Sequence, residues 1–377
     1  MIDVLIVGAG PVGLTAAIVL TQRGRRVQVI DNQAAGANTS RAAVVHARTL
    51  ELLAPYGASP DLVARGVHVP AFSIRDRDTT LLKVPFGGLP TAYPYTLMIS
   101  QADTEALLLR RLEHLGGHVL RPVTLTDATQ LHDGIAAVCA DGRKIDARYL
   151  LGADGLHSTV RRTAGIDFTG GTYADSFVLA DVNLSGGLGA EEVILYFSPA
   201  GLVVVAPLPE GRHRIVATVD EAPTEPDAAF VGRLLDERGP QAQPAIVEQI
   251  VWSSRFRVHH RIADTFRSDR ILLAGDAAHV HSPAGGQGMN LGIEDAVAAG
   301  EALDRVLDGA PQSLLNTYAT ERKRTAEGVI ALAGRLTDLA TLPPGRRRLR
   351  NTALRMAGTL PAVRRAAAHR LSGLDRR

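Results

Sequence analysis

A glycine-rich stretch near the start of the chain has the spacing of a phosphate-binding turn. Gly8, Gly10 and Gly13 form a GxGxxG pattern between an apolar run and a helix-forming sequence. The first glycine permits a tight turn, the second lets the backbone approach a pyrophosphate, and the third allows close packing of helix on strand. Backbone N–H groups at the start of that helix, around Pro11 and Val12, carry partial positive charge. The pattern therefore predicts a dinucleotide site.

An acidic residue supports this prediction. Asp31 ends the next apolar run, eighteen residues after Gly13. A carboxylate at this point can accept hydrogen bonds from ribose hydroxyls and disfavours a 2′-phosphate. These features are compatible with any dinucleotide, including NAD, and a purely structural glycine turn is the alternative.

Two later segments add polar groups at predicted strand ends. GADG at residues 152–155 places Asp154 where it could touch a ribose or a pyrophosphate. The stronger signal is GDAAHVHSPAGGQGMN at residues 275–290, in which Asp276 follows a buried strand. Ligands of open α/β sheets bind at this carboxyl edge, and the glycine-rich turn then begins a helix whose dipole favours negative charge. The residues alone thus predict an anion site at a sheet edge.

The elements that must position these motifs follow from the apolar pattern. A strand at 2–7, a helix at Val12–Arg23 and a strand ending at Asp31 make a βαβ opening with a parallel sheet. Between Tyr173 and Val219, strand-like runs follow one another without helical crossovers, as in an antiparallel sheet. A helix from Gly288 to about Asp308 returns to the first pattern. We expect an α/β fold with a Rossmann-like domain, an inserted antiparallel sheet and C-terminal helices.

Bulk composition excludes several classes of protein. The 377 residues are 46% hydrophobic and 21% charged, as in ordinary globular proteins. The apolar runs are too short for a membrane span, and no signal peptide follows Met1, so we expect a cytoplasmic protein. The single cysteine, Cys139, excludes an internal disulfide, a CxxC redox pair and a multi-cysteine metal site. No metal-ligand spacing is present, and a net charge of +2 gives no reason to expect nucleic-acid binding.

The end of the chain is strongly basic. From Ala331 onward, eleven arginines oppose two aspartates. Such a segment could form a patch for phosphates or anionic lipid, or its arginines could simply be solvated or paired. Because Pro343, Pro344 and Pro361 divide it into short helices, the second interpretation is favoured and one long amphipathic anchor is not expected.

The motifs taken together resemble a known family. GxGxxG, GADGxxSxVR and GDAAHxxxPxGGQGMN, in this order, are similar to those of the single-component FAD-dependent monooxygenases, the aromatic hydroxylases related to para-hydroxybenzoate hydroxylase. SRAAVVHARTLELL at 40–53 and SQADTEALL at 100–108 strengthen the resemblance to the branch that acts on phenols and aromatic polyketides. Many members of this branch continue into a thioredoxin-like C-terminal domain, whereas this sequence ends at LSGLDRR, which fits both a natural absence and a trimmed chain.

The resemblance implies FAD as the cofactor and NADPH or NADH as a transient co-substrate. Arg41 and Gln101 are expected at the ribityl–pyrophosphate part, the backbone of Val123 at the adenine, and Arg161 as a support for the Asp154 turn. The full set of expected cofactor-contacting residues is Gly8, Gly10, Pro11, Val12, Gly13, Asp31, Arg41, Gln101, Val123, Asp154, Asp276, Pro283, Gly285, Gly286, Gln287, Gly288, Met289 and Asn290.

The resemblance also implies a division of labour along the chain. It predicts an FAD-binding domain made of residues 1–69, 100–170 and 270–310. A substrate-binding domain is predicted at residues 70–99 and 171–269. Residues 311–377 are predicted to form a C-terminal helical segment. The implied reaction is hydroxylation of an aromatic, phenolic or polyketide-type substrate by O₂ through a C4a-hydroperoxyflavin. An epoxidase, a Baeyer–Villiger oxygenase and a non-redox accessory flavoprotein are the alternatives. A halogenase is disfavoured because Trp252 is the only tryptophan. A monomer or homodimer is expected.

The residue pattern assigns no catalytic base. The weak candidates are His46, Arg48, Tyr196 and Pro283, and for the first three packing is an alternative interpretation. Further candidates, by position alone, are Tyr93, Tyr95, Arg212 and His213. The pair His259–His260 looks like a metal-ligand pair but is interpreted as structural or exposed.

Overall fold

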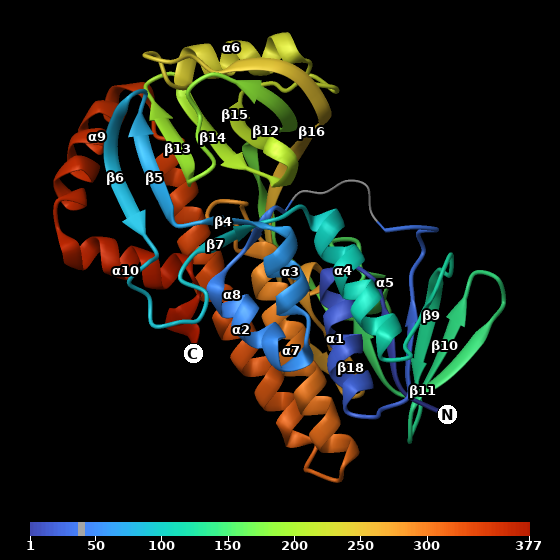
Figure 1. Ribbon diagram of the computed structural model, residues 1–377. Coiled ribbons are helices and arrows are strands. Elements are labelled where there is room, and N and C mark those ends of the chain that lie inside the picture. Colours follow the sequence, from blue (N-terminus) through green and yellow to red (C-terminus); the bar gives the residue numbers. More distant parts are fainter. Residues whose placement is uncertain (37–41) are drawn as a thin grey trace.

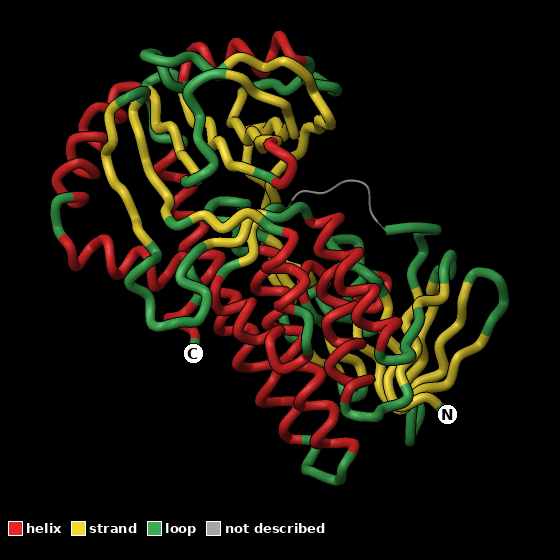
Figure 2. The backbone as a smooth tube through the Cα atoms, in the orientation of Figure 1, coloured by secondary structure: helices red, strands yellow, loops and turns green. Residues whose placement is uncertain are grey.

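A computed structural model describes residues 1–36 and 42–377 of the chain. The strands gather in two separate regions, and the long helices run between and beside them (Figures 1 and 2). The first region is a mainly parallel eight-stranded sheet, and the second is a mainly antiparallel eight-stranded sheet. The α/β fold with an inserted antiparallel sheet, predicted from the sequence, is confirmed.

The first sheet contains the predicted βαβ opening. β1 (Ile2–Val7) pairs in parallel with β2 (Val27–Ile30) on one side and with β11 (Lys144–Gly152) on the other, and α1 (Pro11–Gln22) connects β1 to β2. The strand order is β17-β18-β11-β1-β2-β8, with a hairpin joined to β11. The remaining strands are β8 (Val119–Leu120), β9 (Leu125–Gln130), β10 (Ile135–Cys139), β17 (Arg267–Ser268) and β18 (Ile271–Leu273).

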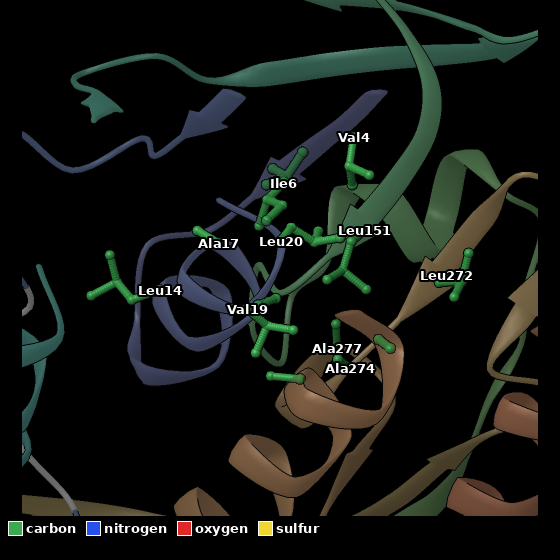
Figure 3. Packing of buried hydrophobic residues seen from close by; sticks show 14 of the residues in the cluster. Val4, Ile6, Leu14, Ala17, Val19, Leu20, Leu151, Leu272, Ala274 and Ala277 are labelled. Carbon is green, nitrogen blue, oxygen red and sulfur yellow. The ribbon is translucent and has the colours of Figure 1, made fainter. Parts of the chain in front are cut away.

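Apolar side chains of the first sheet, of α1 and of the segment after β18 pack together in one buried cluster that also includes α7 (Gly288–Leu307). Figure 3 shows them, and all are buried: Val4, Ile6, Leu14, Ala17, Val19, Leu20, Leu151, Leu272, Ala274 and Ala277. Burial of each large side chain contributes about 1.5–3 kcal/mol. Small residues let the segments approach, because a Cβ added at Gly275 or Gly292 would lie 2.7 Å from the Val12 side chain. The glycine loop therefore packs directly on the segment that follows β18.

The second sheet has the strand order β19-β16-β12-β15-β14-β13-β5-β6. β19 (His279–Val280) lies inside the GDAAH motif and pairs with β16 (Ile246–Ala263), so this sheet is hydrogen-bonded to the cofactor segment. The residue pattern did not predict β16, an 18-residue strand, because polar and basic residues interrupt its apolar alternation. The other strands are β5 (Ala71–Asp76), β6 (Thr79–Pro85), β12 (Phe168–Ser185), β13 (Glu192–Ser198), β14 (Gly201–Pro207) and β15 (Arg212–Val219).

The two faces of the second sheet have different coverings. α6 (Ala228–Arg238) packs on one face, over Ile194, Val203 and Ile215. The opposite face packs on Ala43 and Ala47 and on the C-terminal helices. This second face is therefore the one turned toward the cofactor motifs.

Short elements and the C-terminal helices complete the fold. A three-stranded sheet contains β3 (Val44–Val45), β7 (Thr96–Met98) and β4 (Val67–Val69). The other helices are α2 (Ala47–Leu53), α3 (Ser59–Arg65), α4 (Gln101–His114), α5 (Thr159–Thr163), α8 (Ser313–Ala340), α9 (Pro344–Gly358) and α10 (Pro361–Leu371), and single turns are η1 (Ala54–Tyr56), η2 (Pro209–Gly211), η3 (Gly275–Ala277) and η4 (Leu374–Arg376). Both α9 and α10 begin at a proline, where the missing N–H is not needed.

Candidate cofactor site

The three motifs meet at the carboxyl ends of β1, β11 and β18. Gly8 has a φ of +102°, and a Cβ there would lie 2.2 Å from the Ala153 carbonyl oxygen. A Cβ at Gly13 would lie 1.8 Å from the Gly8 carbonyl oxygen, so both positions require glycine. Gly10 differs, because the nearest atom to a Cβ would be Glu105 Oε1 at 4.0 Å. The loop is thus packed on its sheet side and open at Gly10, where Pro11 begins α1.

Beside the loop lie Asp31 and a cation that the sequence reasoning missed. Asp31 accepts hydrogen bonds from the N–H of Ala9 at 2.6 Å, and the Asp31 carbonyl accepts one from the N–H of Val123 at 2.7 Å. Arg121 donates through Nη2 to the Ala9 carbonyl at 3.2 Å. Its buried Nε has no partner within the described residues. A half-buried guanidinium with an unused donor beside a phosphate loop fits a pyrophosphate. The only sequence signal was an arginine two residues before Val123.

Asp154 and Arg161 hold the second motif together. The Asp154 carboxylate accepts hydrogen bonds from the Ser158 hydroxyl at 2.5 Å and from two backbone N–H groups at the start of α5. Burial raises the pKa of Asp154 despite these bonds. Arg161 donates to the carbonyls of Ala277 at 2.8 Å and Leu156 at 2.9 Å, which ties the GADG turn to the GDA turn. Contact between Asp154 and a cofactor stays a prediction.

Asp276 is exposed although its neighbours Gly275 and Ala277 are buried. Since the backbone of this turn is packed against Val12, the Asp276 carboxylate is the part of η3 that faces outward, where it can accept hydrogen bonds from a ligand. Its position at the end of β18 agrees with the sheet edge expected from the sequence.

A buried ionic cluster lies beneath this turn. Asp295 of α7 accepts hydrogen bonds from the Gly275 N–H at 3.1 Å and from Arg322 Nε at 2.6 Å. Its carboxylate also lies 2.6 Å from His279 Nε2. Burial alone would raise the pKa of this carboxyl, but Arg322 and His279 hold it below its usual value. Glu294 accepts hydrogen bonds from Arg322 at 3.3 Å and from Arg376 near the chain end at 2.7 Å. No sequence pattern pointed to this cluster, because His279, Arg322 and Arg376 reach the two carboxylates of α7 from other parts of the chain.

Asn290 fixes the glycine-rich turn from inside the protein. Its fully buried Oδ1 accepts hydrogen bonds from the His46 N–H at 2.8 Å and the Thr49 hydroxyl at 2.7 Å. Its Nδ2 donates to the carbonyls of Val44 at 2.9 Å and Gly286 at 2.8 Å. The Asn290 side chain thus joins the turn to residues 44–49. Any contact between Asn290 and a cofactor would therefore be made by its backbone.

His46 and Gln287 also hold the glycine-rich turn, through its Gly285 carbonyl. His46 Nε2 lies 3.0 Å from the Gly285 carbonyl, and burial lowers the pKa of His46 to about 4. The ring is therefore neutral at pH 7, and its buried Nδ1 has no partner among the described residues. Gln287 donates to the carbonyls of Gly285 and Leu371, both at 3.1 Å. The Pro283 carbonyl accepts the Gly286 N–H at 2.9 Å. Gly288 and Met289 begin α7.

A buried ion pair of the second sheet contacts Ala42, in the segment that leads to His46. Arg214 donates two hydrogen bonds to Asp181, at 2.7 and 2.8 Å, and one to the Ala42 carbonyl at 2.9 Å. Gln101 also engages Ala42, accepting its N–H at 3.4 Å. Arg41, expected beside them, lies outside the described residues. The pair Arg214–Asp181 was not found from the sequence, since its two members come from neighbouring strands of an antiparallel sheet.

Several weak candidates for catalysis are engaged in core packing or in local contacts. Tyr196 is fully buried in the core beneath α6, on the far face of the second sheet, and burial raises its pKa to about 12. The geometry therefore does not support Tyr196 as a base. Arg48 pairs with Glu51 at 3.6 Å. Arg212 forms an ion pair with Glu210. Tyr95 stacks on His68 and packs edge-on against Tyr93. His213 is buried on β15.

The histidine pair lies on a strand and not in a cluster of ligands. His259 and His260 are part of β16, and His259 Nδ1 is 2.8 Å from the Thr172 hydroxyl. Among the side chains that the structure describes, no group of three or more His, Cys, Asp or Glu residues is arranged to hold a metal ion. Among the described helices, none combines the length and the hydropathy that a membrane span requires.

The fold and the site define a protein that binds a flavin dinucleotide, with an open glycine loop, an unused Arg121 donor and an exposed Asp276 at one sheet edge. The chain belongs to the FAD binding domain family, which matches residues 1–333. The resemblance to FAD-dependent monooxygenases and the prediction of FAD as cofactor are both confirmed.

Known proteins are similar over most of the chain. Over 363 residues it is 41% identical to 6-methylpretetramide 4-monooxygenase of Streptomyces rimosus, covering 91% of this chain and 64% of that protein. The chain thus spans just under two thirds of that relative. The structure of p-nitrophenol 4-monooxygenase from Pseudomonas putida DLL-E4 matches with a TM-score of 0.87 and 27% identity, over 98% of this chain and 96% of that one. A Diels-Alderase of pyrroindomycin biosynthesis matches with a TM-score of 0.83 and 28% identity, over 99% and 80% of the two chains.

Proposed function

We propose that the protein is an FAD-dependent monooxygenase that inserts one atom of O₂ into an aromatic substrate of phenolic or polyketide type, with NADPH or NADH as reductant. The observation that supports this most is the meeting of the glycine loop, the GADG turn and the GDA turn at one sheet edge, with the second sheet hydrogen-bonded to the segment that follows the GDA turn. Two similar proteins named above are monooxygenases, one of 6-methylpretetramide and one of p-nitrophenol.

In this proposal each cofactor contact has a physical reason. The open loop at Gly10 and the guanidinium of Arg121 bind the pyrophosphate, since both present N–H donors. Asp31 accepts hydrogen bonds from the ribose hydroxyls, and Asp276 accepts hydrogen bonds from the ribityl hydroxyls. The N-terminal end of α7, after Gly288, stabilises negative charge on the ring system. When bound, FAD takes electrons from the nicotinamide and activates O₂ for insertion into the substrate.

The substrate would lie between the cofactor and the second sheet. We propose that residues 1–69, 100–170 and 270–310 bind FAD, that 70–99 and 171–269 contact the substrate, and that 311–377 support both. The apolar side chains of the second sheet on this side, such as Phe72 and Val204, help to exclude water. His46 is neutral at pH 7 because of its low pKa, so it positions the Gly285 turn by hydrogen bonding and contributes no charge.

The test uses the purified yellow protein, in air, with NADPH or NADH and a panel of phenols and polycyclic phenols. We expect one or more of these compounds to accelerate NAD(P)H oxidation and to give a product heavier by one oxygen, labelled when ¹⁸O₂ is supplied. Product structure would separate hydroxylation from epoxidation and Baeyer–Villiger insertion. Failure of both nicotinamides to bleach the flavin with the full panel present would refute the proposal. The same preparation, run through a sizing column, distinguishes monomer from homodimer.

A non-redox function is the second candidate, because the chain is similar over 99% of its length to a Diels-Alderase. This alternative predicts conversion of a substrate without NAD(P)H, without O₂ and without a change in mass. Running the panel anaerobically and without nicotinamide therefore separates the two functions.

A further inference from the structure

The C-terminal helices combine high positive charge with an outward apolar face. Residues 339–374 contain eight arginines and no acidic residue. One side of α9 packs on the second sheet, where the buried Arg350 donates to the Phe197 carbonyl at 2.9 Å. Figure 1 shows α9 at the outer edge of the molecule, beside β6. Its opposite side therefore faces away from the protein.

The outward side of α9 has an apolar stripe. Leu349, Ala353 and Met356 follow one another at intervals of four and three residues, so they share one face of the helix. Leu349 is 74% exposed, Met356 is 63% exposed, and Leu360, in the joint to α10, is 54% exposed. These account for three of the seven large hydrophobic side chains that are exposed within the described residues. Exposure concentrated on one helix is unusual for a surface that meets only water.

Arginines flank the stripe on both sides. With about 100° per residue, Arg346 lies roughly 60° to one side of Leu349, and Arg348 and Arg355 lie roughly 100–120° to the other. All three are exposed, and their guanidinium groups have no hydrogen-bond or ion-pair partner in the described part of the chain. An apolar centre between arginines is the pattern of a helix that lies in a membrane interface, where the long basic side chains reach the headgroups.

We propose that this α9 surface, made of Arg346, Arg348, Leu349, Arg355, Met356 and Leu360, docks the protein on an anionic phospholipid surface. The positive charge is complementary to anionic headgroups, and the three apolar side chains enter the boundary below them. A second copy is a poorer occupant, because a two-fold contact would set the arginines of one stripe against those of the other. The docking is peripheral and leaves the helix packed on its sheet.

The test is sedimentation of the FAD-loaded protein with vesicles. We expect binding to phosphatidylcholine vesicles that contain phosphatidylglycerol, little binding to phosphatidylcholine alone, and a loss of binding as salt rises. Replacing Arg346, Arg348 and Arg355 by serine is expected to weaken binding at least about tenfold, since each arginine near an anionic leaflet contributes about fivefold. The double change Leu349→Ser and Met356→Ser is expected to weaken it about fivefold or more.

A matched control removes the same charge elsewhere. Serine at Arg110, Arg305 and Arg324, which are exposed on α4, α7 and α8, should leave most of the binding intact. Melting temperature and FAD content should be equal in all variants, because none of the substituted side chains is packed in the core. Absence of binding to phosphatidylglycerol vesicles at low salt would overturn the proposal. So would equal loss in the control variant, or light scattering that detects a dimer dissociated by Leu349→Ser and Met356→Ser.

Discussion

Replacement of Asn290 by alanine is expected to lower both the free energy of unfolding and the affinity for FAD. The change removes four hydrogen bonds, two buried ones from His46 and Thr49 and two partly buried ones to Val44 and Gly286. Each such bond contributes about 1 kcal/mol, so the free energy of unfolding should fall by about 4 kcal/mol. For 377 residues the unfolding entropy is about 0.8 kcal/mol per degree, which predicts a melting temperature lower by about 5 °C. FAD affinity should fall at least about tenfold, since the Gly286 turn loses its anchor.

The measurements are thermal unfolding followed by circular dichroism and FAD dissociation followed by flavin fluorescence. Thr49→Val is the matched control, because it removes one of the four bonds and leaves Asn290 Oδ1 with the His46 N–H. It should cost about 1 kcal/mol and change FAD affinity little. An Asn290→Ala protein that melts within 1 °C of the parent and binds FAD within twofold would refute the reasoning.

Three further outcomes follow from the site. Asp276→Ala should fold normally but lose FAD on gel filtration, and an equally yellow variant would contradict its assignment to the ribityl chain. Burial lowers the pKa of His46 and of His281 to about 4, below the unfolded value near 6.5. The contribution of these neutral histidines to the free energy of unfolding is therefore complete above pH 6.5 and is lost as the pH falls toward 4. For His46 the loss is about 3 kcal/mol. The variant His46→Gln should therefore flatten the pH dependence of the melting temperature over that range. Tyr196→Phe should keep its turnover number, because the hydroxyl lies beneath α6; a loss of a hundredfold would restore Tyr196 as a catalytic candidate.

Most of the polar contacts that fix the site could not be predicted from the sequence. His46 and Gly285 are 239 positions apart, and Asn290 reaches Val44 across 246. Asp295 gave no signal because it lies inside an apolar helix, and only packing turns it toward Gly275 and His279. Tyr196 was misleading for the opposite reason. Period-two alternation tells which residues share a face of a strand, but not which face the cofactor occupies.

Through their resemblance to a known family, the motifs indicated FAD, and by itself the sequence determined the α/β class and the inserted sheet. It did so because the glycine pattern reports local backbone requirements, such as the positive φ of Gly8, and because apolar periodicity reports which elements form. Only the tertiary structure decided that Arg121 joins the glycine loop, that Asn290 and Asp295 hold the late turns from within, and that the stripe on α9 faces outward. These depend on which surfaces meet when distant segments pack, and no local spacing encodes that.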